Sequence, residues 1–132
     1  MQLNEISSKI IKAAINVHKE LGPGLLESVY QRCMIIELRE MGLSCEAEVP
    51  VKIMYKNHDV SDEAFYIDLL VEGQIIIELK SVEQVKDVHK KQLLTYLRLR
   101  KLSLGLLINF NEVLLKNGIT RIVNEFKGDV LP

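Results

Sequence analysis

Three charged residues, Asp68, Glu78 and Lys80, lie within the two strongly apolar runs of residues 65–80, outside the turn between them. These runs lie on either side of Gly73. We expect two strands joined by a short turn there, because glycine can adopt positive φ. Removing a carboxylate from water is costly unless the carboxylate is paired, protonated or bound to a metal. The three residues therefore need partners, and they are the first candidates for chemistry.

The parity of the two strands decides whether the carboxylates meet. Side chains alternate along a strand, so Glu78 and Lys80 share one face of the sheet. Asp68 lies opposite Glu78 only if the connecting loop has an odd number of residues, and a three-residue loop at 72–74 satisfies this condition. A two-residue loop would place the two carboxylates on opposite faces. We expect the three-residue loop.

Such a pair of carboxylates indicates a metal site. Two adjacent carboxylates repel each other, and a divalent cation removes that repulsion. A lysine beside them, as Lys80 would be, can orient a water molecule or stabilise negative charge that develops on a phosphate. The pattern thus predicts metal-assisted chemistry on a phosphate ester.

Three short motifs resemble those of one nuclease superfamily. Asp68 followed by Glu78-Leu79-Lys80 resembles the D…(D/E)xK signature of the PD-(D/E)xK nucleases, although such a triplet alone is common by chance. The upstream segment GLLESVY, residues 24–30, resembles the motif that names the GxxExxY protein family, which is usually placed in that superfamily. Gln92 and Tyr96 resemble a glutamine–tyrosine motif of an exonuclease-like branch. The three motifs together, within a resemblance that runs over residues 6–124, are specific.

The resemblance implies a reaction, a cofactor and the residues that would carry them. It implies a divalent-metal-dependent nuclease that hydrolyses phosphodiester bonds in DNA, with Mg²⁺ as the cofactor and Mn²⁺ as a substitute. Asp68, Glu78, Glu27 and the backbone carbonyl of Leu79 would be the metal ligands. Lys80 would position the attacking water and stabilise charge on the phosphate, so the residues implied in catalysis are Lys80, Asp68, Glu78 and Glu27.

The residues that we expect to contact the substrate lie on two predicted helices, and they are Tyr30, His89, Lys90, Gln92 and Tyr96. The stripe formed by His89, Gln92 and Tyr96 has helical spacing and faces either the hairpin or solvent. Residues 80–101 carry seven basic against two acidic residues, which can engage phosphates or can simply be a solvated helix face. Tyr30, by residue type alone, is more typical of the edge of a core.

Two residues have alternative interpretations. Glu27 falls in the first turn of a predicted helix, where an acidic side chain also complements the helix dipole. Tyr66 stands two residues before the hairpin aspartate, where members of the family commonly have arginine. A tyrosine cannot supply that charge, and this departure bears on how strongly a substrate is held.

The remaining elements follow from periodicity and turn residues. We expect an α/β (α+β) restriction-endonuclease-like core of order αβββαβ, with a mixed central sheet flanked by helices, in a single domain over residues 1–132. A continuous apolar strand at 103–110 would pair parallel to the strand of Lys80. The predicted helices are 3–21 with Asn4 as N-cap, 25–41 with Gly42 after it, and 86–99; the other strands are 45–55, with Pro50 at an edge or bulge, and 119–126, with a turn at 56–59.

Composition limits the partners. The net charge is −1, so no global basic field attracts nucleic acid, and a local patch must hold it. Cys33 and Cys45 lack metal-type spacing, and no signal peptide or long apolar span is visible, which predicts a cytoplasmic protein with no membrane partner. No glycine-rich phosphate loop or paired-cysteine motif supports a small-molecule or redox enzyme. Two alternatives stay open, namely a catalytically inactive module of the same fold that binds nucleic acid or a protein, and a homodimer.

Overall fold

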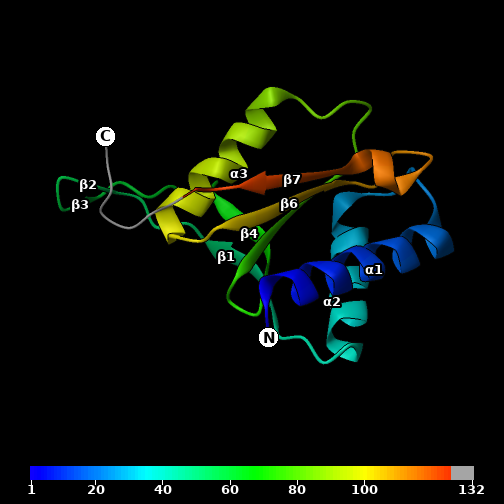
Figure 1. Ribbon diagram of the computed structural model, residues 1–132. Helices are drawn as coiled ribbons and strands as arrows, with labels where there is room; N and C mark the ends of the chain where they lie inside the picture. Colours follow the sequence, from blue (N-terminus) through cyan, green and yellow to red (C-terminus); the bar gives the residue numbers. More distant parts are fainter. Residues whose placement is uncertain (126–132) are drawn as a thin grey trace.

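One mixed sheet organises residues 1–125, the part of the chain that the computed structural model describes. The chain begins with two helices and then forms strands on either side of a third helix (Figure 1). In order, the elements are α1 (Leu3–Leu21), α2 (Glu27–Glu40), β1 (Cys45–Pro50), β2 (Met54–Tyr55), β3 (His58–Asp59), β4 (Tyr66–Val71), β5 (Ile75–Lys80), α3 (Asp87–Arg100), β6 (Leu104–Asn109), the 3-10 helix η1 (Leu115–Gly118) and β7 (Ile119–Val123).

The sheet has the strand order β1-β4-β5-β6-β7. Strands β1, β4 and β5 pair antiparallel to one another. Strand β6 pairs parallel to β5, and β7 pairs antiparallel to β6 at the edge of the sheet. The parallel partner of β5 follows α3, as a crossover requires. The predicted mixed sheet and the order αβββαβ are confirmed, and β7 is the expected edge strand. Residue 126, the end of the predicted last strand, lies outside the described residues.

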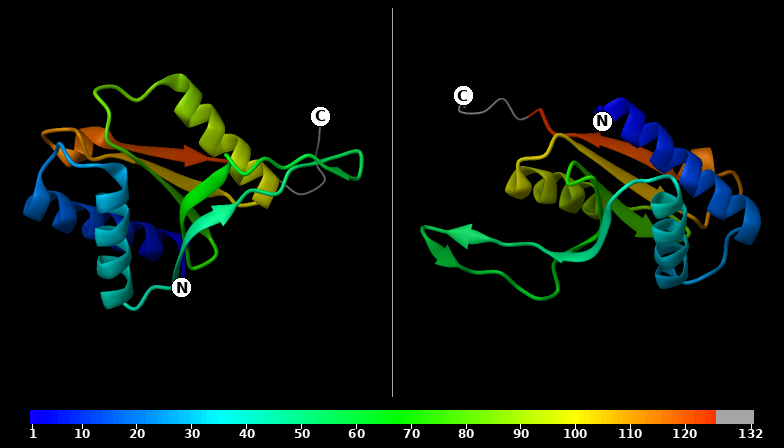
Figure 2. Two further views of the ribbon diagram at one scale, coloured as in Figure 1. Left: turned by 180° about the vertical axis from the view of Figure 1, so that it is seen from behind. Right: turned by 90° about the horizontal axis from the view of Figure 1, so that it is seen from below.

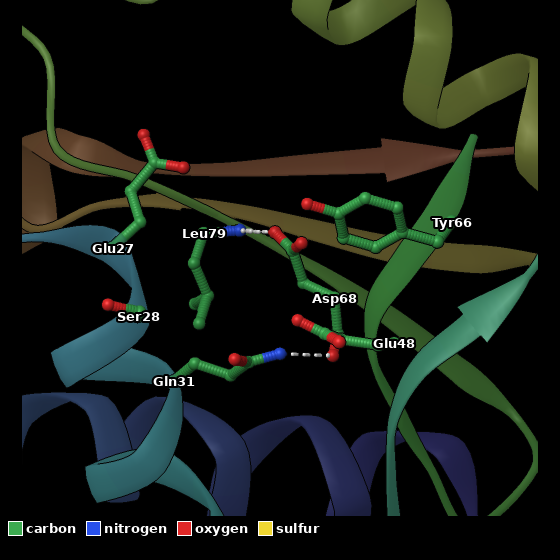
Figure 3. A pocket seen from close by; sticks show the side chains of 7 residues that line it. All are labelled: Glu27, Ser28, Gln31, Glu48, Tyr66, Asp68 and Leu79. Atoms are coloured by element: carbon green, nitrogen blue, oxygen red, sulfur yellow. Dashed lines mark hydrogen bonds between the residues drawn. The ribbon is translucent and has the colours of Figure 1, made fainter. Parts of the chain in front are cut away.

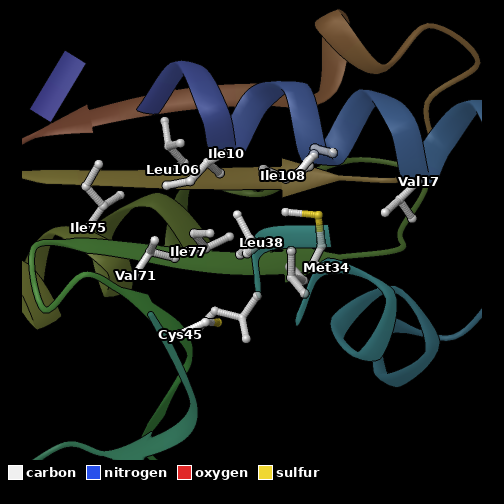
Figure 4. Packing of buried hydrophobic residues seen from close by; sticks show 14 of the residues in the cluster. Ile10, Val17, Met34, Leu38, Cys45, Val71, Ile75, Ile77, Leu106 and Ile108 are labelled. Atoms are coloured by element: carbon white, nitrogen blue, oxygen red, sulfur yellow. The ribbon is translucent and has the colours of Figure 1, made fainter. Parts of the chain in front are cut away.

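Helices cover both faces of the sheet. Helices α1 and α2 lie on one face and α3 on the other (Figures 1 and 2). The larger core lies under α1 and α2, where Ile10, Met34, Leu38 and Ile77 have no exposed surface (Figure 4). The smaller core lies under α3 and includes Leu93. The i, i+3, i+4 spacing of apolar residues on α1 explains why that helix packs on the sheet.

The beginnings of the first two helices differ from expectation. Helix α1 begins at Leu3 with Gln2 as its N-cap, and no side chain caps it, so the prediction of Asn4 as N-cap is wrong. Helix α2 begins at Glu27, because Leu26 keeps an extended conformation with φ −73° and ψ 150°. Its end agrees with expectation, since Gly42 has φ +81° after the last turn.

The predicted strand 45–55 is divided. Strand β1 ends at Pro50, which has no N–H to donate to a ladder. The chain then leaves the sheet and forms a separate two-stranded arm, β2 with β3, which extends away from the body of the protein (Figure 2). Lys56 and Asn57 both have positive φ at its tip, as a two-residue hairpin turn requires. The turn therefore consists of residues 56–57 and is shorter than the predicted turn at 56–59, because His58 and Asp59 belong to β3.

Candidate active site

The β4–β5 hairpin has the predicted register. Val71 pairs with Ile75 and Leu69 with Ile77, so residues 72–74 form a three-residue loop. Glu72 and Gly73 both have positive φ, 54° and 62°. The next position in this register places Asp68 opposite Glu78.

The main-chain ladder between β4 and β5 opens at that position, and the two carboxyl groups take its place. The backbone N–H of Asp68 donates to Oε2 of Glu78 at 3.2 Å, and the backbone N–H of Leu79 donates to Oδ2 of Asp68 at 2.8 Å. The N–H and C=O of one strand residue point to the same side. The carbonyl of Leu79 therefore faces the same gap as both carboxyl groups.

Glu78 is the buried member of the pair, with 6% of its surface exposed. Burial raises its pKa, the negative charge of Asp68 raises it further, and the result is a pKa of about 9. Glu78 is therefore protonated at neutral pH when no cation is near. A bound divalent cation would reverse this balance, because it stabilises the carboxylate form.

Helix α2 brings a third carboxylate to the site. Glu27 is the first residue of this helix and lines the same cavity of about 80 Å³ as Asp68 and Leu79 (Figure 3). One turn later Gln31 donates from Nε2 to the backbone carbonyl of Asp68 at 3.1 Å. The cavity is lined by Glu27, Ser28, Gln31, Glu48, Tyr66, Asp68 and Leu79.

Tyr30 holds the segment that leads to Glu27. Its hydroxyl donates to the carbonyl of Gly22 at 2.6 Å and accepts from the N–H of Leu25 at 3.2 Å. Its ring stacks on Phe110, with 4.4 Å between centroids and 7° between planes. Tyr30 has no exposed surface, so the prediction that it contacts the substrate is wrong for this structure. It positions the turn before α2.

Two further hydrogen-bonded links fix the chain after Lys80. Ser81 donates from Oγ to the carbonyl of Leu25 at 2.6 Å, which ties the end of β5 to the turn before α2. Asn109, 1% exposed, donates to the carbonyl of Val82 at 2.9 Å and accepts from its N–H at 3.1 Å. Sequence reasoning did not identify Asn109. The sequence feature that could have identified it is a single amide side chain near the end of a continuous apolar strand.

Helix α3 presents the other predicted residues. Tyr96 is 4% exposed, and its pKa rises to about 12 through burial and then through the charges of Glu78 and Asp68. Tyr96 packs in the smaller core on the inner side of α3, and its hydroxyl is neutral at neutral pH. Lys90 and Gln92 are half-buried on the same helix, and a substrate contact for them stays a prediction.

His89 lies at the beginning of α3. Its Nδ1 accepts from the backbone N–H of Lys86 at 3.2 Å, which caps the helix. Burial lowers its pKa, the charges of Lys80 and Lys86 lower it further, and Glu27 opposes them. His89 does not line the cavity that holds Asp68; it lines a separate one with Val82, Glu83, Gln84 and Lys86.

Four residues that line the cavity were not among the predicted site residues: Ser28 and Gln31 on α2, Glu48 on β1 and Tyr66 on β4. Glu48 lies on β1 opposite Asp68, between the pairs Ala47–Leu69 and Val49–Ile67. Its φ of 52° is strained for a residue with a side chain. Tyr66 is exposed beside Asp68, whose charge is the largest cause of the raised pKa of the phenol. Strand parity predicted that Tyr66 shares the face of Asp68, but it gave no indication of Glu48, which lies on another strand.

The cavity is acidic but does not hold a complete set of side-chain ligands. Within residues 1–125, no three His, Cys, Asp or Glu side chains are placed to bind one metal ion. A cation at the opened end of the hairpin would therefore depend on the Asp68 and Glu78 carboxylates, the Leu79 carbonyl and water. Hard oxygen donors of this kind suit Mg²⁺ or Mn²⁺, which retain several waters when bound.

One property of the helices and two comparisons with known proteins bear on identity. No helix within residues 1–125 is long and apolar enough to cross a bilayer. No curated protein matches the chain. The family model described as the PD-(D/E)XK nuclease superfamily matches residues 4–122, nearly the whole of the described structure and nearly the extent that the three motifs indicated. Nucleases of this superfamily generally use divalent metals. The chain belongs to the PD-(D/E)XK nuclease superfamily.

Proposed function

We propose that this protein is a divalent-metal-dependent nuclease that hydrolyses phosphodiester bonds in DNA. The observation that carries the proposal is the opened end of the β4–β5 hairpin, where Asp68, Glu78 and the carbonyl of Leu79 face one gap. Within the superfamily we place the chain in the GxxExxY branch. The Gly24–Tyr30 segment supports this placement, because Tyr30 holds the turn from which Glu27 reaches the cavity.

Mg²⁺ fits the donor set, and Mn²⁺ would replace it. Asp68, Glu78 and the Leu79 carbonyl would hold the cation, and Glu27 would complete or adjust the site across the cavity. A divalent ion supplies charge neutralisation and a more acidic water at neutral pH. Glu78 must lose its proton to bind the ion, because its pKa is about 9 in the metal-free protein. The charge of a divalent ion nearby would favour that loss.

Lys80 would act on the reacting groups themselves. It follows Glu78 by two residues and so shares its face of the sheet. Its ammonium group would orient the attacking water and stabilise the charge that develops on the phosphate. His89, Lys90 and Gln92 on α3 would contact the strand beside the cleaved bond, within the basic segment 80–101.

A second function has specific observations in its favour. Tyr66 stands where arginine is common in the family, the cavity lacks a complete side-chain ligand set within residues 1–125, and the net charge is −1. These features also suit a catalytically inactive module that binds nucleic acid or a protein partner. For either function we also propose a cytoplasmic location and a homodimer. Light scattering of the purified chain tests whether it is a dimer.

A cleavage assay separates the two functions. The substrates are single-stranded, duplex and hairpin DNA and the same sequences as RNA, each with Mg²⁺, with Mn²⁺ and with a chelator. The proposal predicts DNA cleavage that requires the metal and is lost in Asp68→Asn. No cleavage of any substrate by a folded wild-type protein, together with binding of nucleic acid, would favour the inactive module.

A further inference from the structure

A second cavity adjoins the candidate active site. It has a volume of about 440 Å³, against about 80 Å³ for the cavity at the carboxyl pair. It lies between β1, β4 and the segment 60–65 that leads from the arm back to β4, where Ser61, Asp62 and Phe65 contribute to its wall. Glu48 and Tyr66 line both cavities, so Tyr66 stands at the boundary between a space suited to an ion and a space suited to a larger group.

The lining of the larger cavity does not suit a phosphate backbone. Glu48, Asp62 and Glu63 place three carboxylates on its wall, and no Lys or Arg of the described chain lines it. Like charges in this arrangement repel phosphate groups. Apart from Ser61, the rest of the wall is apolar or aromatic and includes Pro50 and Phe65. A flat, uncharged group with amino edges suits this lining, because carboxylates accept hydrogen bonds from such groups.

Two aromatic rings are exposed where that group would lie. Tyr66 is 43% exposed and Phe65 is 38% exposed, although both belong to the most apolar part of the chain. Phe65 is held edge-on by the buried ring of Tyr96, with 6.4 Å between centroids and 74° between planes. Figure 3 shows the ring of Tyr66 beside Asp68 at the mouth of the smaller cavity. An aromatic surface therefore begins beside the carboxyl pair.

We propose that Tyr66, supported by Phe65, stacks on one unpaired base of the substrate strand, and that this nuclease acts on single-stranded or frayed DNA. This inference rests on the proposed function. Base-paired DNA keeps its bases in the helical stack and cannot offer one to the cavity without unpairing it. Proteins that bind single strands combine aromatic platforms with basic surfaces that follow the phosphates. Here α3 and its basic residues would follow the phosphates, and the acidic cavity would take the base.

The test uses the full chain with Lys80→Ala, which prevents cleavage during binding. The probe is a DNA oligonucleotide with one 2-aminopurine, used as a single strand and as a blunt duplex of the same sequence, in Mn²⁺. We expect tighter binding of the single strand and quenching of 2-aminopurine fluorescence by stacking. Tyr66→Leu should weaken single-strand binding about 5- to 150-fold and abolish the quenching, and Tyr66→Phe should retain both.

Tyr55→Leu is the matched control, because Tyr55 is an exposed tyrosine at the far end of the arm and does not line the cavity. It should bind like the parent, and all variants should melt at similar temperatures. Equal affinity for duplex and single strand, or an unchanged affinity in Tyr66→Leu, would overturn the stacking inference and leave the proposed nuclease intact. Absence of binding to either form, with no cleavage by the wild type, would overturn both.

Discussion

The two ends of the β4–β5 hairpin are built differently. At the closed end, main-chain hydrogen bonds join the strands, and the paired residues Leu69 and Ile77 have no exposed surface. At the open end, the side chains of Asp68 and Glu78 accept the hydrogen bonds that a ladder would otherwise supply. The apolar end of the hairpin thus fixes the backbone that carries the two carboxyl groups. The closed end stabilises the fold, and the open end is where we propose that the chemistry occurs.

The largest expected effect is on cleavage at the open end. Lys80→Ala should reduce the rate about 10²- to 10³-fold or more, since the ammonium group acts on charge in the transition state. Mn²⁺ affinity should stay the same or rise slightly, because a nearby positive charge is removed. Lys80→Arg should not restore cleavage, as a planar guanidinium cannot occupy the place of a compact ammonium. Cleavage by Lys80→Ala at the wild-type rate would show that the assigned mechanism is wrong.

A change at the closed end should act on stability alone. Ile77→Ala should lower the free energy of unfolding by about 2–5 kcal/mol, because it leaves a cavity in the larger core. Urea denaturation measures this loss, and Mn²⁺ affinity measured below the unfolding range should not change. Ile36→Ala, at a position that is 58% exposed, is the matched control and should have little effect. Loss of metal affinity in folded Ile77→Ala would contradict the division between the two ends.

The pH dependence of stability should report the open end. The folded-state pKa of Glu78, about 9, lies above its ordinary value of 4.5. The folded protein therefore holds this proton more tightly than the unfolded chain. The contribution to stability is complete below pH 4.5 and is lost as pH rises toward 9, with a slope of at most about 1.4 kcal/mol per pH unit.

Glu78→Gln removes the titrating group and should remove this part of the slope. The measurement is urea denaturation of both proteins in a chelator between pH 5 and 9, and the variant should be the more stable one at the upper end. If the two stability curves stay parallel across this range, Glu78 does not titrate as the structure indicates.

The smallest expected effect concerns the turn before α2. Tyr30→Phe keeps the stacked ring but removes both hydrogen bonds of the hydroxyl, which should cost about 1 kcal/mol of stability. Cleavage should fall modestly as well, because the start of α2 positions Glu27. Tyr55→Phe, at an exposed position, controls for loss of a phenol. A cleavage rate unchanged in Tyr30→Phe would mean that Glu27 needs no such positioning.

The sequence predicted the parts of the fold that local spacing determines. The alternation of side chains and the length of the 72–74 loop placed Asp68 opposite Glu78, and the 3.6-residue period located the three helices to within a few residues. The separate β2–β3 arm was not predicted, because Pro50 left two outcomes open. A proline can end a strand or sit in a bulge, and packing against the rest of the chain decides between them.

Spacing alone predicted the candidate site only within the hairpin, whereas Glu27 on α2 was implied by the motif resemblance and lines the same cavity as Asp68. The hairpin pair followed from parity, but the contact of Tyr30 with Gly22 depends on how α1 and α2 pack. Glu48 lies in the cavity because β1 pairs with β4 in one particular register and because its backbone has positive φ. No local pattern signals either condition.

The most direct test of the account is a calorimetric titration of Mn²⁺ into the wild-type protein at pH 7, repeated in buffers of different ionisation enthalpy. If Asp68 and Glu78 bind the ion together, Glu78 must give up its proton, since its pKa is about 9 in the metal-free protein. The account predicts binding with release of about one proton per ion, and no binding in Asp68→Asn. Binding without proton release, or no binding at millimolar Mn²⁺, would contradict it.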